Sequence, residues 1–224
     1  MDAVKTALLK AALPHVAFDG WGEASFRAAA ADAGLDAEAA RTACPRGALD
    51  LAVAYHKAGD DAMRAAVAAT PFVGARVRER ITFAVRSRIE AGDREVVRRG
   101  TVLFALPLHA AEGAGLIWGT ADAIWEALGD PSDDINWYSK RAILSGVYGS
   151  VVLFWLGDDS EGAAATWDFL DRRIEDVMRI EQVKGQLRAN PLTKGPVAAV
   201  ESLLSRVKAP SRTPRDDLPG RWRA

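Results

Sequence analysis

The side chains most able to do chemistry, three histidines and one cysteine, are scattered along the sequence. His15, His56 and His109 lie far apart without the spacing of metal ligands, so each is interpreted as a helix-surface or hydrogen-bonded core residue. Cys44 precedes Pro45 at an expected helix end, and no histidine neighbours it in the sequence to activate it as a nucleophile. We therefore expect no catalytic residue, no metal site and no cofactor.

The longer motifs of common catalytic sites are also missing from the sequence. There is no Glu-x-x-His pair of a metal-binding helix, no G-x-S-x-G nucleophile turn and no phosphate-binding P-loop. Gly113 and Gly115 have the spacing of a dinucleotide-binding loop, but Trp118 occupies the third glycine position and no strand is expected before them. An enzyme is therefore the least favoured class of function.

Composition sets the outer limits for the fold and its partners. The 224 residues allow one larger domain, or a small module joined to a larger one. The 29 Lys and Arg residues nearly balance the 30 Asp and Glu residues, so the net charge of −1 gives no general attraction to nucleic acid or anionic membranes. A single cysteine excludes an internal disulfide. No stretch reaches the roughly 18 uncharged apolar residues that a membrane-spanning helix needs.

The elements that must position any site are helices, because apolar residues recur at intervals of three and four rather than in alternation. We expect an all-α fold. Within residues 1–48, helices are expected at 2–17, 25–33 and 36–42, and Gly34 separates the last two. Two short helices joined in this way have the helix-turn-helix pattern.

The second helix of that pattern is poorly suited to DNA. Asp36 and Glu38 would repel phosphate, and only Arg41 could contact a base edge. We therefore interpret the module as degenerate and structural, and expect no nucleic-acid partner. The alternative is a one-component, repressor-like transcriptional regulator that senses a hydrophobic ligand.

Residues 49–189 are expected to form a larger helical domain with one strongly basic stretch. Eight arginines lie between residues 73 and 99, and they are interpreted as a solvated or acid-paired helix face. They are Arg76, Arg78, Arg80, Arg86, Arg88, Arg94, Arg98 and Arg99.

The stretch 101–128 is so apolar that its helices must be enclosed by other elements. Pro107 and the glycines at 113, 115 and 119 reduce straightness and volume, which favours a pocket, although packing of the same side chains as a plain core is the alternative. The side chains expected to line an apolar pocket are Leu103, Phe104, Leu106, Trp118, Ile124, Trp125, Leu144, Val147, Tyr148 and Val151.

The last part of the chain is expected to be a linker with an amphipathic helix, residues 190–209, and a disordered Pro- and Arg-rich tail, residues 210–224. The apolar face and basic end of that helix are typical of helices that lie on a membrane surface, with packing onto the domain as the alternative. The residues expected to contact the membrane are Val197, Val200, Leu203, Leu204, Val207 and Lys208.

Two long aromatic motifs lie between residues 129 and 184. The first, D-x-N-W-Y-x-x-R, consists of Asp134, Asn136, Trp137, Tyr138 and Arg141, and the second, T-W-x-F-L-x-x-R, of Thr166, Trp167, Phe169, Leu170 and Arg173. With these motifs the segment resembles the Coq-nine family of ubiquinone-biosynthesis accessory proteins. The resemblance extends more weakly over residues 2–128 and to the amphipathic terminal helix.

This resemblance implies a tetracycline-repressor-like helical bundle with a degenerate N-terminal helix-turn-helix. It also implies an isoprenoid or ubiquinone-precursor lipid as ligand and the di-iron demethoxyubiquinone hydroxylase as partner. The sequence lacks a mitochondrial transit peptide, so we expect a bacterial protein of the cytoplasm, peripherally associated with the inner membrane. By analogy with repressor folds, a homodimer through residues 133–156 and 161–187 is expected.

The first motif is the expected docking surface for the hydroxylase. Trp137 and Tyr138 begin a helix that Ser132 or Asp133 is expected to cap, and two large aromatics at an exposed helix start would make strong contacts with a partner. A core location for Trp137 is the alternative. We therefore assign partner binding to Asp134, Asn136, Trp137, Tyr138 and Arg141.

Overall fold

The computed structural model describes residues 3–189 and 207–210, and side chains within residues 3–179 and 207–210. These residues form helices and connecting turns without a strand, so the predicted all-α fold is confirmed. The helices are α1 (Ala3–Asp19), α2 (Glu23–Asp32), α3 (Ala37–Ala43), α4 (Ala48–Ala69), α5 (Val77–Glu90), α6 (Arg94–Ala105), α7 (Ala110–Ala127), α8 (Ile135–Leu156) and α9 (Ala164–Ala189), with a 3-10 turn, η1 (Glu161–Ala163), before α9.

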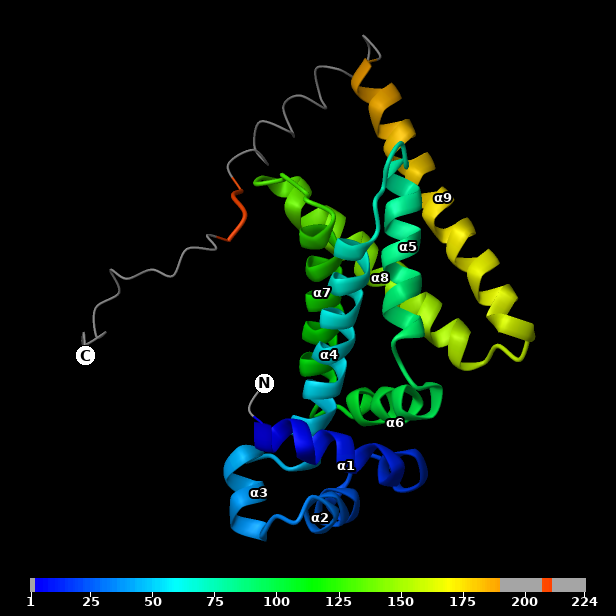
Figure 1. Cartoon of the computed structure of the whole chain (residues 1–224). Coiled ribbons are helices and arrows are strands. Elements are labelled where there is room, and N and C mark those ends of the chain that lie inside the picture. Colours follow the sequence, from blue (N-terminus) through cyan, green and yellow to red (C-terminus); the bar gives the residue numbers. More distant parts are fainter. Residues whose placement is uncertain (1–2, 190–206, 211–224) are drawn as a thin grey trace, which may run out of the picture.

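The first three helices gather at one end of the molecule, beside the first turns of α4 (Figure 1). α3 begins one residue after the predicted start, because Asp36 caps it: the Asp36 carboxylate accepts a hydrogen bond of 2.7 Å from the Ala39 amide. Small residues allow these short helices to approach closely around a shared apolar core. The buried members of this N-terminal core are Leu8, Leu9, Ala12, Val16, Trp21, Phe26, Ala29, Ala30, Ala40, Cys44, Ala48, Leu51, Ala52, Ala54 and Val96.

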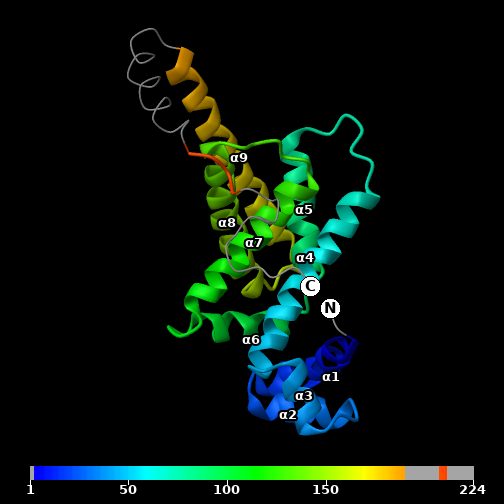
Figure 2. The ribbon, with the colours of Figure 1, turned by 90° about the vertical axis from the view of Figure 1, so that its left-hand side faces the viewer.

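α4 connects this end to the rest of the molecule. It packs against α5 and α7, while α7 packs against α8 and α8 against α9. α6 runs across the molecule between the N-terminal helices and the upper helices, as Figures 1 and 2 both show. A second core fills the upper part and includes Met63, Val67, Ile81, Val85, Ile124, Leu144, Val151, Trp155, Leu170 and Ile174.

Several expected element bounds are wrong. α8 is capped by Asp134, whose carboxylate accepts a 2.9 Å hydrogen bond from the Asn136 amide, and not by Ser132 or Asp133. Pro107, expected to break or loosen the backbone, lies in the turn that separates α6 from α7. α9 begins at Ala164, because Gly162 has a φ of 61° and interrupts the helix expected from residue 161.

The expected membrane helix falls mostly where nothing is described: Val197, Val200, Leu203 and Leu204 lie outside the described residues. Val207 and Lys208 are described and exposed, and they are not helical. Within the described ranges, no helix combines the length and the apolar character needed to cross a membrane.

Candidate functional site

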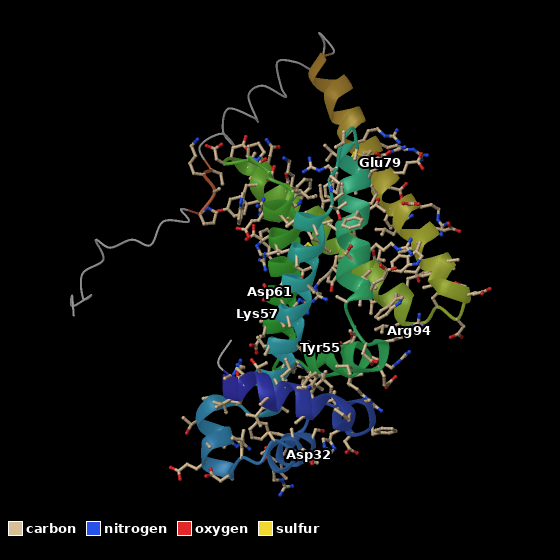
Figure 3. All side chains as sticks on the ribbon, viewed as in Figure 1. Asp32, Tyr55, Lys57, Asp61, Glu79 and Arg94 are labelled. Atoms are coloured by element: carbon tan, nitrogen blue, oxygen red, sulfur yellow. The ribbon has the colours of Figure 1, made fainter. Side chains whose placement is uncertain are left out.

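The main cavity, of about 420 Å³, lies among α4, α6, α7 and α8. Its volume lies in the range of small-molecule sites. The wall is mostly aliphatic and aromatic, and six representative side chains are Trp21, Ala52, Val97, Phe104, Ile117 and Val152. Tyr55 borders it from α4 and is labelled in Figure 3 at the level of α6. Such a wall suits an apolar ligand because it offers few hydrogen bonds.

One side of the cavity is polar, and its polar groups form a connected buried network. Arg88 on α5 donates from Nε to the Asp60 carboxylate over 2.6 Å and from Nη2 to the His56 carbonyl over 2.8 Å. The Arg88 and Asp60 side chains are only 6% and 8% exposed. Thr120 on α7 donates to the same Asp60 oxygen over 2.8 Å. The positive charge of Arg88 is therefore neutralised inside the fold by the carboxylate of Asp60.

His56 extends this network to the cavity wall. Its Nε2 lies 2.8 Å from the Thr120 hydroxyl oxygen and 3.2 Å from the Leu116 carbonyl oxygen. Burial, followed by the repulsion of Arg88, lowers the pKa of His56 to about 4, so the imidazole is neutral near pH 7. A neutral imidazole carries one donor and one acceptor nitrogen.

A close approach of two helices shapes the wall beside Phe104. A Cβ atom added at Gly113 on α7 would lie 2.7 Å from the Cβ of Phe104 on α6, closer than side chains tolerate. The neighbouring Gly115 and Gly119 have nothing within 4 Å of such an atom. Of these three glycines, only Gly113 is required by the packing of the cavity wall.

The structure distributes the ten expected pocket residues over several places. Phe104 and Tyr148 line the main cavity, and Trp125, Leu144 and Val147 line a second cavity of about 210 Å³. The remaining five lie elsewhere: Ile124 and Val151 are fully buried in the upper core, Leu103 packs on the N-terminal core, Trp118 lies against Trp137, and Leu106 is half exposed. The ten residues therefore do not form one surface.

Sequence analysis missed the polar side of the cavity, although a signal for it exists. Arg88 follows Ile81 by seven residues and Val85 by three, so it continues the apolar stripe of α5. His56 and Asp60 precede Met63 on α4 in the same kind of phase. A polar residue in phase with a buried stripe indicates a buried polar group. Of the two interpretations of the arginines, a solvated or an acid-paired face, Arg88 fits the acid-paired one, but its pair with Asp60 is buried.

The first aromatic motif is organised around a buried arginine. Arg141 is 0% exposed, and its guanidinium binds Asp122 at 2.5 Å and Asp130 at 3.3 Å. The guanidinium carbon lies 4.1 Å from the centre of the Trp137 ring. Trp137 itself is only 8% exposed, so it takes the core position that the sequence left as the alternative. Because Arg141 and Trp137 are buried, neither presents its side chain to a partner in this conformation.

The exposed part of the motif is smaller than expected. Asn136 is exposed, while Asp134 and Tyr138 are partly exposed. The Tyr138 hydroxyl donates to the Lys208 carbonyl over 3.3 Å, and the Ala209 amide donates to the Asp133 carbonyl over 2.8 Å. The described segment 207–210 therefore lies beside the start of α8.

The second motif supports the start of α9. The Asp158 carboxylate accepts hydrogen bonds from the Thr166 hydroxyl at 2.5 Å and the Thr166 amide at 2.9 Å. Hydrogen bonds from Ser160 and Thr166 hold the pKa of Asp158 well below its usual value. Trp167 lies under Arg86, and Phe169 stacks on Phe154 with ring centres 4.6 Å apart. These residues fix α9 on the bundle.

The N-terminal module uses its one candidate base-reading side chain internally. Arg41 pairs with Glu23 and lies 4.8 Å above the centre of the Phe26 ring. In the part of the chain that the structure describes, no group of three His, Cys, Asp or Glu side chains is placed to hold a metal ion. The geometry thus provides an apolar cavity with a polar side, on an all-helical scaffold.

Comparison with solved structures defines the class of this scaffold. It is similar to the crystal structure of a TetR transcriptional regulator from Nitrosomonas europaea, with a TM-score of 0.64 and 21% sequence identity. The similarity covers 78% of this chain and 97% of the regulator. The predicted tetracycline-repressor-like fold is therefore confirmed; at this identity the similarity shows the fold alone.

Sequence comparisons show which proteins the chain is similar to. A model of the COQ9 family matches residues 110–181. The rat protein "Ubiquinone biosynthesis protein COQ9, mitochondrial" is 33% identical over 107 residues, which are 47% of this chain and 34% of the rat protein. The Drosophila melanogaster protein of the same name is 27% identical over 192 residues, 83% of this chain and 59% of the fly protein. The predicted resemblance to COQ9 proteins is confirmed over these residues.

These comparisons also correct the predicted location and show how much of its relatives' length the chain covers. The expected location, in the bacterial cytoplasm at the inner membrane, is wrong, because the matching relatives are named as mitochondrial proteins. The chain spans about a third of the length of the first relatives, 34% of both the rat and the bovine protein.

Proposed function

We propose that this chain is a non-catalytic accessory protein of ubiquinone biosynthesis that binds an isoprenoid lipid in the cavity among α4, α6, α7 and α8. The observation that carries the proposal is this cavity of about 420 Å³, with its mostly apolar wall. The match to the COQ9 family over residues 110–181 supports the pathway.

The physical role of such a protein follows from the cost of moving a polyprenyl chain out of a bilayer. Each CH₂ group transferred from an apolar environment to water costs about 0.8 kcal/mol, so a long chain does not leave the membrane unaided. A protein cavity that replaces the bilayer around part of the chain offsets this cost. The lipid can then be presented to an enzyme that works on its polar ring.

We further propose the di-iron demethoxyubiquinone hydroxylase as the partner that receives the lipid. The exposed side of the first motif, with Asn136 and Tyr138, is the part of that motif able to contact another protein. Trp137 and Arg141 lie behind it and hold the start of α8 in place. Contact with a membrane surface and a homodimer through α8 and α9 belong to the same proposal.

The lipid-binding part is tested by mass spectrometry of lipids extracted from the purified chain. Gly149 lines the cavity and has nothing within 4 Å of an added Cβ, so Gly149→Leu fills the space without a backbone clash. Gly146 is equally unobstructed on α8 but exposed, which makes Gly146→Leu the matched control. We expect bound isoprenoid lipid in wild type and control, and at least a tenfold loss in Gly149→Leu. Equal lipid content in all three proteins would remove the cavity from the proposal.

The docking part is tested by co-purification with the hydroxylase. Tyr138→Ala should weaken association while the lipid content stays unchanged, because Tyr138 does not line the main cavity. Ala142→Ser, an exposed change on the same helix, is the control. Undiminished association of Tyr138→Ala, or its loss in the control, would count against this surface.

A further inference from the structure

We propose that the polar side of the main cavity selects lipids whose polar end is an uncharged hydroxyl group, a phenol or an alcohol, and that this hydroxyl donates its hydrogen bond to Nδ1 of His56. The inference rests on the proposed lipid-binding function and adds the class of head group to it. It also orients the lipid, with the hydroxyl at α4 and the apolar chain along the remaining wall.

The direction of each hydrogen bond in the network fixes the tautomer of His56. Ionised Asp60 can only accept, so the Thr120 hydroxyl donates its single proton to Asp60 over 2.8 Å. The Thr120 oxygen, 2.8 Å from Nε2 of His56, must then act as the acceptor in that contact. The Leu116 carbonyl, 3.2 Å from Nε2, is also only an acceptor. Nε2 therefore carries the hydrogen.

It follows that Nδ1 of His56 holds a lone pair. Among the described residues, the hydrogen bonds of the His56 ring are made by Nε2, and His56 lines the cavity. The lowered pKa of His56, about 4, keeps Nδ1 unprotonated near pH 7. A ligand group that satisfies this nitrogen must donate a hydrogen bond. A hydroxyl does so, whereas an ether or a hydrocarbon end does not.

The charges around the cavity disfavour anionic head groups. Arg88 is the cationic side chain of the cavity wall, and the carboxylate of Asp60 already neutralises it at 2.6 Å. A carboxylate or phosphate placed here would be desolvated without a free cation to pair with. A hydroxyl brings no charge, and its hydrogen bond replaces the one lost to water.

The test measures the affinity of the full chain for three probes with the same farnesyl chain: a farnesyl-substituted phenol, its methyl ether, and farnesyl monophosphate. Affinity is obtained by titration against a fluorescent lipid that the probes displace. We expect the wild-type protein to bind the phenol about tenfold more tightly than either of the other probes, the size of one added buried hydrogen bond.

Variants assign that preference to His56. His56→Phe should bind phenol and ether equally, while His56→Asn, which can place an amide oxygen near the position of Nδ1, should retain part of the preference. Thr120→Val removes the closer of the two acceptors that fix the tautomer and should reduce the preference several-fold. The assignment can therefore be tested even if His56→Phe does not fold. Val152→Ala changes the apolar wall alone and should weaken binding of phenol and ether by the same factor.

The outcomes separate this inference from the function on which it rests. If the wild type binds phenol and ether equally, or prefers the phosphate, the head-group inference is overturned and lipid binding stands. If it prefers the phenol but His56→Phe and Thr120→Val keep the full preference, the assignment to His56 is overturned. If none of the probes binds, the proposed lipid-binding function and the inference fail together.

Discussion

Among the side chains that the structure describes, two arginines are buried, and they are held in different ways. Arg88 on α5 forms an ion pair with Asp60, which also accepts a hydrogen bond from the neutral Thr120 hydroxyl. Arg141 on α8 contacts both Asp122 and Asp130, and Asp130 has a second cation, Lys140, at 2.6 Å. One pair is isolated beside a cavity, while the other is part of a larger network under an aromatic motif.

This difference indicates which buried carboxylate is left without a compensating cation when its arginine is removed. Burial raises the pKa of Asp130, but hydrogen bonds from Lys140, Ser132 and Arg141 outweigh this effect and hold the pKa below its usual value. If Arg141 is removed, Lys140 still compensates Asp130. If Arg88 is removed, no second Lys or Arg among the described residues forms an ion pair with Asp60. The isolated pair beside the cavity is therefore the more vulnerable of the two.

The largest expected effect is the loss of the isolated ion pair. Arg88→Met should lower the free energy of unfolding by about 4 kcal/mol, because an uncompensated carboxylate remains buried. Urea denaturation followed by circular dichroism measures this. Adding Asp60→Asn to Arg88→Met should recover at least about 1 kcal/mol, since it removes the stranded charge. No recovery would mean that lost packing, and not the buried charge, sets the cost.

A smaller loss is expected at the networked arginine. Arg141→Met should lower the free energy of unfolding by about 3 kcal/mol, because Asp130 keeps Lys140 as a partner. Arg179→Met, at a side chain that is 68% exposed, is the control and should change stability by less than about 0.5 kcal/mol. A loss larger than that of Arg88→Met would reverse the comparison.

Sequence analysis found one of these arginines and missed the other for a physical reason. Arg141 belongs to a long motif, so a family resemblance singles it out. Arg88 is one of eight arginines in a stretch of 27 residues, and local charge alone does not distinguish it from its exposed neighbours. Its phase with Ile81 and Val85 does, but only if helix phase is considered together with charge.

The fold was easier to predict from the sequence than the cavity, because helix periodicity and helix caps are local signals. The helix expected at 36–42 is α3, displaced by one residue and capped by Asp36. The cap of α8 was harder to predict. Ser132, Asp133 and Asp134 all have side chains that can cap a helix, and packing decides among them. The cavity is lined by residues of α4, α5 and α6 as well as of α7 and α8, and such a tertiary arrangement cannot be predicted from the apolar stretch 101–128 alone.

Lowering the pH should destabilise the packing around His56, at the cavity, more than the packing around Arg141. The pKa of His56 is about 4 in the folded chain and about 6.5 when unfolded, so the unfolded state binds more protons between these values. Stability therefore falls as pH falls through this window, by about 2 kcal/mol at about pH 5. Thermal unfolding across this range should show that His56→Phe has a shallower pH dependence than wild type. The same slope in both proteins would assign the acid sensitivity to other groups.

The smallest expected change in stability compares a glycine in the closely packed cavity wall with a glycine on the open surface of the same helix. Gly113→Ala forces Phe104 to move, because the new Cβ would meet the Phe104 Cβ at 2.7 Å, and should lower the free energy of unfolding by about 1 kcal/mol. Gly115→Ala, on the same helix with nothing within 4 Å, should instead raise it by about 0.5 kcal/mol through helix propensity. Opposite signs in urea denaturation would show that α6 and α7 are held in close contact at Gly113. A stabilising Gly113→Ala would mean that Phe104 moves freely, so that the cavity wall is loose there while the Arg141 side stays fixed.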